Sequence, residues 1–171
     1  MLDLLGKNQK FSDLLVLMFD DIIALGPDVR PPDVTPRTGI HCCIKEPQSR
    51  NIIMPYAYTP SVVAMHLSSE KIGRAFEKGY YSSRIGADPK KFEFPGGLIA
   101  KYGWIMVLIG VSGLLSDEDE MAAFVLHSHL LKLSPNKLKT VIYPNEASVP
   151  WEVFNPDGYI WRTLSPYCYK H

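Results

Sequence analysis

The chain has 171 residues, of which 46% are hydrophobic and 21% charged, and this composition excludes a wholly disordered protein. Eighteen basic side chains balance eighteen acidic ones, so the net positive field expected of a protein that binds nucleic acid or acidic membranes is absent. The length predicts a single domain, at ~100–200 residues per domain. A net charge of zero also favours self-association.

Three cysteines, two of them adjacent, are too few for a disulfide framework and lack a metal-binding spacing. We expect the adjacent Cys42 and Cys43 to be buried or half-buried thiols in a reducing compartment, and Cys168 is the third cysteine. The N-terminal residues have no signal-peptide pattern, and the longest apolar run, 104–115, is shorter than the ~20 residues that span a bilayer. We therefore predict a soluble, cytoplasmic protein with no membrane segment, no nucleic-acid partner and no dedicated metal site.

The first predicted helix covers residues 11–25, where apolar side chains recur with helical spacing until Gly26 and Pro27 end the pattern. Apolar side chains also lie off this stripe, at Val16, Leu17, Phe19 and Ile23. Exposed together, they would form a patch of the kind that soluble monomers avoid. The helix is therefore expected to be covered by another segment or by another subunit.

A stiff, proline-rich segment at 27–36 leads into two predicted strands, 38–46 and 51–57. The next helix is expected to begin at Thr59 and Pro60, with threonine as the N-cap, and to run to about residue 83.

A second hairpin is predicted from strands at 97–101 and 104–112, because a short connection that contains glycine joins two apolar runs. Ser116 is the expected N-cap of a helix over 117–133. The four acids that follow Ser116 would complement the helix dipole, and because successive helical residues point in different directions they do not form a metal site.

Hairpins separated by helices predict an α/β (α+β) fold with an antiparallel sheet flanked by helices, over residues 1–133. Residues 134–171 are rich in proline and aromatic side chains and show no helical period. They are expected to form an extension that packs on this domain or on a neighbouring subunit.

Glycines border the second hairpin, at Gly96 and Gly97 before it and at Gly113 after it, next to Ser112. Such glycines either form turns or let the backbone approach a ligand closely. Lys71 and Arg74 lie one helical turn apart. They form either a solvated face or an anion-binding rim beside the glycines.

Between Ser68 and Ala123 the sequence resembles the GlcG-like family, which includes haem-binding and haem-degrading proteins and one type of cobalamin adenosyltransferase domain. Four segments carry the resemblance: 71–75, 94–98, 109–113 and 116–120. The resemblance implies a profilin-like α/β fold and oligomer formation.

Together, residues and resemblance predict a small-ligand-binding domain, with haem or another tetrapyrrole as the candidate ligand. The predicted site consists of Lys71, Arg74, Gly96, Gly97, Ser112 and Gly113. The alternative is an oligomeric interaction protein without a small ligand. A homo-oligomer is expected, with residues 11–25 or 134–171 at the subunit contact. An enzyme is supported only by the family resemblance, because no nucleophile–base pair or metal motif is present.

Overall fold

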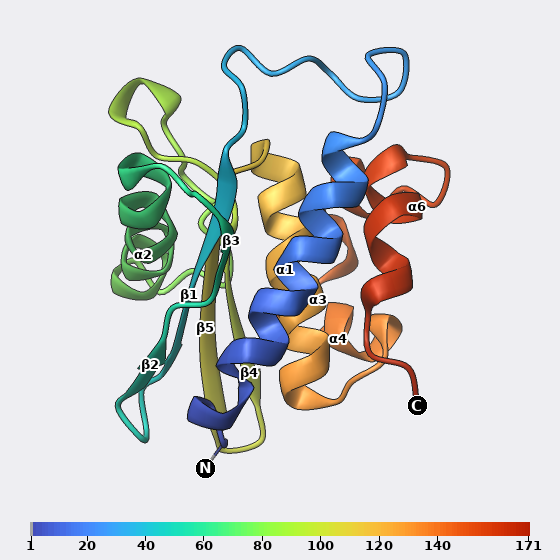
Figure 1. Ribbon diagram of the computed structural model, residues 1–171. Coiled ribbons are helices and arrows are strands. Elements are labelled where there is room, and N and C mark those ends of the chain that lie inside the picture. The colour runs from blue at the N-terminus through green and yellow to red at the C-terminus, as the bar shows by residue number, and fades with distance from the viewer. Residues whose placement is uncertain (1) are drawn as a thin grey trace.

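A computed structural model describes residues 2–171 of the protein (Figure 1). In chain order its main elements are α1 (Asn8–Ile23), β1 (Gly39–Glu46), β2 (Asn51–Ile53), β3 (Tyr56–Tyr58), α2 (Val62–Glu77), β4 (Gly97–Tyr102), β5 (Ile105–Ser112), α3 (Ser116–Leu131), α4 (Pro135–Ile142), α5 (Trp151–Phe154) and α6 (Tyr159–Leu164). Short 3₁₀ turns occur at four further places.

The five strands form one antiparallel sheet in the order β2-β1-β5-β4, with β3 also paired to β1. This arrangement confirms the predicted class, an antiparallel sheet flanked by helices. The strand expected at 51–57 is divided in two at Met54 and Pro55, because proline has no N–H to donate to the ladder. The Pro55 carbonyl instead accepts a hydrogen bond of 2.9 Å from the Cys42 N–H.

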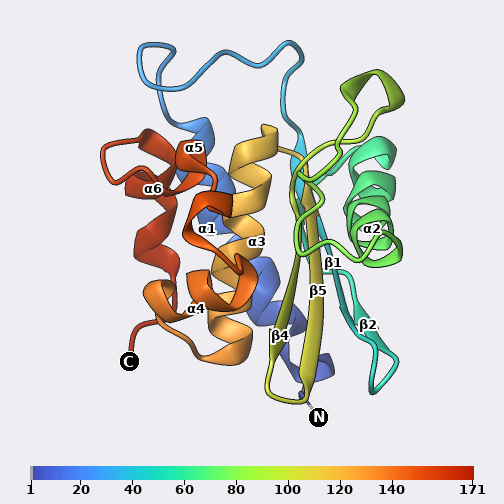
Figure 2. The same cartoon turned by 180° about the vertical axis from the view of Figure 1, so that it is seen from behind.

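Helix α2 lies on one face of the sheet, and α1 and α3 lie on the other (Figure 1). Helices α5 and α6 cover the outer side of α3, and α4 packs against both α3 and the edge strand β4 (Figure 2). At the centre of the α2 face, a Cβ atom on Gly110 would lie 1.9 Å from the Ser68 carbonyl oxygen. The backbone of α2 therefore rests directly on β5, and a glycine is required at the crossing point.

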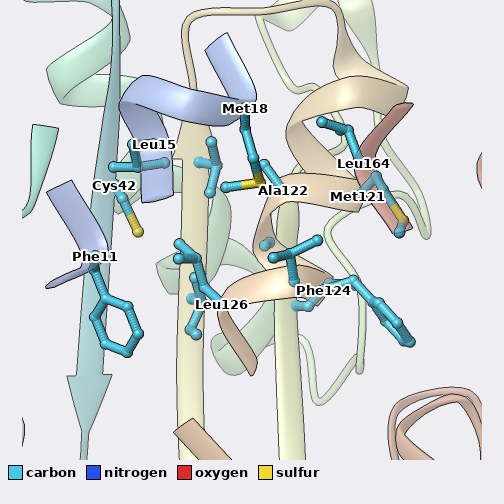
Figure 3. Packing of buried hydrophobic residues seen from close by; sticks show 14 of the residues in the cluster. Phe11, Leu15, Met18, Cys42, Met121, Ala122, Phe124, Leu126 and Leu164 are labelled. Atoms are coloured by element: carbon cyan, nitrogen blue, oxygen red, sulfur yellow. The ribbon is translucent and has the colours of Figure 1, made fainter. Parts of the chain in front are cut away.

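The larger hydrophobic core lies between the sheet and α1 and α3 (Figure 3). Phe11, Leu15 and Met18 of α1 meet Cys42 of β1 and Leu126 of α3, and all five side chains are fully buried. The same cluster continues without a break into the C-terminal helices.

The extension at 134–171 packs on its own chain and is largely helical, although its sequence shows no helical period. Its helices have eight, four and six residues, which is too short for a period to show in the sequence. Leu138, Phe154 and Leu164 join the main core. The hydroxyl group of Tyr167 also donates a hydrogen bond to the carboxylate of Asp21 on α1.

Helix α1 has less exposed apolar surface than the sequence predicts. Phe19 is only 6% exposed, and its ring packs against Tyr58 with the ring centroids 5.4 Å apart. Val16 is half-buried. Leu17 and Ile23 remain 49% and 38% exposed. Of the four side chains of the predicted patch, the chain thus covers Phe19 almost fully and Val16 in part.

Helix α2 begins later and ends earlier than predicted. Its N-cap is Ser61, whose hydroxyl accepts a hydrogen bond of 3.1 Å from the Ala64 N–H, so the assignment of Thr59 as the cap is wrong. The helix ends at Glu77, and Gly79 follows with a φ of +70°, a left-handed conformation that suits glycine.

All three cysteines are free and buried, and for Cys42 and Cys43 this agrees with the prediction. In residues 2–171 no helix combines the length and apolar character needed to cross a membrane.

Candidate functional site

Three consecutive acids at the start of α3 are almost completely buried. The residues Glu118, Asp119 and Glu120 are 0%, 2% and 0% exposed. Because neighbouring helical residues project ~100° apart, the three carboxylates point in different directions. Each meets a different basic side chain: Arg30, Lys71 and Arg84, respectively.

Asp119 and Lys71 form a buried ion pair between α3 and α2. The Lys71 Nζ atom lies 2.9 Å from Asp119 Oδ2 and donates a second hydrogen bond of 2.7 Å to the Val111 carbonyl oxygen. Burial raises the pKa of Asp119 to about 6, although the charge and hydrogen bond of Lys71 act in the opposite direction. The pair joins α2, the end of β5 and the start of α3.

Glu118 connects three segments that are distant in the sequence. It accepts two hydrogen bonds from the Arg30 guanidinium, of 2.6 Å and 2.9 Å, and one of 2.9 Å from the Tyr159 hydroxyl of α6. Arg30 also donates to Asp33 over 2.7 Å. The segment that joins α1 to β1 is thereby fixed to α3 where it crosses one end of the molecule (Figure 1).

The same acids cap α3, and Ser116 does not. The Leu115 N–H donates to Glu118 Oε2 over 2.9 Å, and the Leu114 N–H donates to Asp119 Oδ1 over 3.0 Å. Ser116 is the first residue of the helix, and no side-chain cap is formed by the preceding residue. The prediction of a Ser116 cap is therefore wrong.

Ser116→Ala is expected to change the free energy of unfolding by less than ~0.5 kcal/mol, compared with the ~1 kcal/mol of a lost N-cap. Glu118→Ala should cost ~3–5 kcal/mol, because it removes a cap and leaves Arg30 buried without Glu118. Urea denaturation of the two variants measures the difference. Equal losses would contradict this assignment of the cap.

Two adjoining pockets of about 260 and 280 Å³ lie at the end of the molecule crossed by the α1–β1 segment. Both are lined by Arg37, Leu67 and Ser112, and together they form what we call the Arg37 groove. Gly113 lines the first pocket, and the Lys71–Asp119 pair lines the second. The groove thus gathers residues from the α1–β1 segment, α2, β5 and α3.

Arg37 enters the groove with one side of its guanidinium fixed. Its Nε atom donates to Asp33 Oδ1 over 2.7 Å, and no hydrogen bond to a residue in 2–171 is made by its two terminal amino groups. Burial alone would raise the pKa of Asp33, but hydrogen bonds from Arg30 and Arg37 outweigh it and the pKa is lowered. Asp33 is therefore held as an anion that orients Arg37.

The predicted site residues are only partly brought together. Lys71, Ser112 and Gly113 line the groove. Gly96 and Gly97 lie against Lys71, and a Cβ atom on Gly96 would approach the Lys71 Nζ atom to 2.8 Å, so these glycines make room for the lysine.

Arg74 has a different set of partners. Its guanidinium donates to Glu70, to the Ser83 carbonyl and to the Phe94 carbonyl, over 2.7, 2.8 and 3.0 Å. It fixes the loop between α2 and β4. Arg37, which the sequence analysis did not single out, has the free donors instead, and its one sequence signal is its position directly after the proline-rich segment.

The histidines of the sheet and of α3 lie outside the groove. His41 Nδ1 is 2.7 Å from the Ser68 hydroxyl, and His127 Nε2 is 3.2 Å from the Leu98 carbonyl. Neither pocket of the groove has histidine, cysteine or methionine in its wall. The groove therefore offers no axial ligand for haem iron, and within residues 2–171 no three histidine, cysteine or acidic side chains converge on a metal position.

Burial of His127 predicts a loss of stability in acid. Burial lowers its pKa to about 4, below the value in the unfolded chain, so the unfolded state takes up the proton first as the pH falls. Between pH 6.5 and 4.5, His127→Gln should reduce the slope of unfolding free energy against pH by up to ~1.4 kcal/mol per pH unit.

Asp119, whose pKa is raised to about 6, contributes the opposite slope. Asp119 is present in both wild type and His127→Gln, so its contribution to the slope cancels when the two are compared. His66→Gln, at an exposed position of α2, is the control. Parallel curves for wild type and His127→Gln in urea titrations would contradict the prediction.

Comparison with protein-family models, with curated proteins and with solved structures found no match to this chain. The fold and the site by themselves define an α/β protein with an antiparallel sheet, helices on both faces and a polar groove at one end. The GlcG-like resemblance stays a prediction that rests on the four sequence segments described above.

Proposed function

We propose that the protein binds a small anionic molecule in the Arg37 groove. The observation that supports this most directly is the unpartnered pair of amino groups on Arg37, on a guanidinium that Asp33 already orients. A planar guanidinium with two free donors is suited to a carboxylate or phosphate group.

Lys71 supplies a second cationic group at the base of the groove. Its ammonium carries three N–H donors, of which two are directed to Val111 and Asp119. The third makes no hydrogen bond within residues 2–171. Asp119 balances the charge of Lys71, so the attraction for an anion comes mainly from Arg37.

The size of the groove favours a ligand smaller than a tetrapyrrole. Its two pockets, of about 260 and 280 Å³, each lie just below the ~300–1,000 Å³ typical of sites for drug-sized ligands. Their walls also lack an axial ligand. We therefore favour a small carboxylate or phosphate over haem.

The test is calorimetric titration with inorganic phosphate, acetate and succinate. Arg37→Met should weaken binding of the preferred anion by ~10-fold, the effect of losing one charge-assisted contact. Arg162→Met, at an exposed site on α6, should bind like wild type. The proposal is wrong if none of the three anions binds below ~10 mM or if both variants bind equally. A separate haemin titration should produce no Soret shift.

An oligomeric interaction protein is the second candidate. Ile52 and Tyr56, on the edge strands β2 and β3, are 49% and 58% exposed, and Phe76 of α2 is 49% exposed. These apolar groups are available for a contact between subunits. Light scattering tests this, and a 19.3 kDa monomer at micromolar concentration would contradict it.

A further inference from the structure

A larger pocket lies on the C-terminal extension, separate from the Arg37 groove. Its volume is about 580 Å³, within the range of ~300–1,000 Å³ typical of small-molecule sites. All of its lining residues fall between 136 and 156, from α4 through the following loop to just beyond α5. Figure 2 shows these elements on the side of the sheet that carries α3, opposite α2. We call it the extension pocket.

One wall of the extension pocket carries a fixed cation. The Nζ atom of Lys139 lies 5.6 Å from the centre of the Phe154 ring and 5.3 Å from that of Trp161. Attraction to the two aromatic faces holds the half-buried side chain in place. No carboxylate in residues 2–171 forms an ion pair with Lys139, so no carboxylate neutralises its positive charge.

An exposed aromatic ring adds apolar surface to the pocket, beside the cationic Lys139. Trp151, at the start of α5, lines the pocket and is 66% exposed. Pro144, Val149 and Phe154 add apolar surface beside it. An indole face of this kind offers a flat surface for stacking an aromatic ring.

We infer that the extension pocket binds an amphipathic organic anion, with an aromatic body against Trp151 and a carboxylate or sulfonate directed to Lys139. The acid that also lines the pocket, Glu146, is exposed and makes no ion pair in residues 2–171. Its side chain is free to turn into water, whereas Lys139 is held in the wall. Glu146 therefore weakens binding of the anion without preventing it.

The probe for this site is 8-anilinonaphthalene-1-sulfonate, an aromatic sulfonate whose fluorescence reports binding. Lys139→Met and Trp151→Ala should each weaken its binding by ~5-fold or more, the loss expected for a charged or stacking contact. Glu146→Gln should strengthen binding, because it removes a negative charge from the wall.

Each variant has a matched control on the same molecule. Lys137→Met removes an exposed lysine from α4 that does not line the pocket. Trp104→Ala removes a tryptophan that is 68% exposed in the β4–β5 turn. Both controls should bind the probe like wild type, and circular dichroism should show that all variants are folded.

Two outcomes would overturn the inference. One is no saturable binding of the probe to the wild-type protein below ~1 mM. The other is equal loss of binding in the pocket variants and their controls, which would indicate general adsorption to apolar surface. Arg37→Met should leave probe binding unchanged. This variant therefore distinguishes binding in the extension pocket from binding in the Arg37 groove.

Discussion

Lys71→Met is expected to lower the free energy of unfolding by ~3–5 kcal/mol at pH 8, because it leaves the Asp119 carboxylate buried without its cation. The loss should be smaller at pH 5. Even beside Lys71 the pKa of Asp119 is raised to about 6, and removing the lysine raises it further. The folded variant therefore takes up a proton as the pH falls, and the neutral carboxyl group is less costly to bury.

Urea denaturation at pH 5 and pH 8 measures this effect. The double variant Lys71→Met/Asp119→Leu should recover much of the loss, since it replaces both buried charges with apolar groups. Lys101→Met, at an exposed position of β4, should remain close to wild type at both pH values. A loss in Lys71→Met that is small and independent of pH would show that the pair is not buried as described.

Gly110→Ala is expected to cost more than ~3 kcal/mol or to prevent folding, because it places a methyl group where the backbone of α2 lies. The added Cβ atom would be 1.9 Å from the Ser68 carbonyl oxygen, which no side-chain rotation relieves. Helix α2 would have to move away from β5. That movement would separate Ile72 from Leu108 in the smaller core cluster.

The matched control is Gly73→Ala, within α2 itself. A Cβ atom there has no neighbour within 4 Å, so alanine should stabilise the protein by up to ~1 kcal/mol through its higher helix propensity. Circular dichroism followed during thermal unfolding separates the two outcomes. A Gly110→Ala protein as stable as wild type would mean that α2 does not rest on β5 at this point.

Local sequence patterns were enough to predict the sheet and the class of fold. The predicted strands 38–46, 97–101 and 104–112 agree with β1, β4 and β5 to within one residue at each end. These elements are long enough to show their periodicity, and a short turn joins β4 to β5, so neighbouring residues carry the necessary information. Lys71, Ser112 and Gly113, which the sequence analysis placed in one site, all line the Arg37 groove, and their role in ligand binding stays a prediction.

The partners of the charged residues became clear from the three-dimensional packing and not from the sequence. Glu118 pairs with Arg30, 88 positions away, and Arg37 reaches the groove from a segment without regular structure. Local patterns contain no information about such long-range contacts, which depend on how whole elements pack. The same holds for the cap of α3, where buried acids replaced Ser116, and for the C-terminal helices, which are too short to show a period and are fixed by the core they cover.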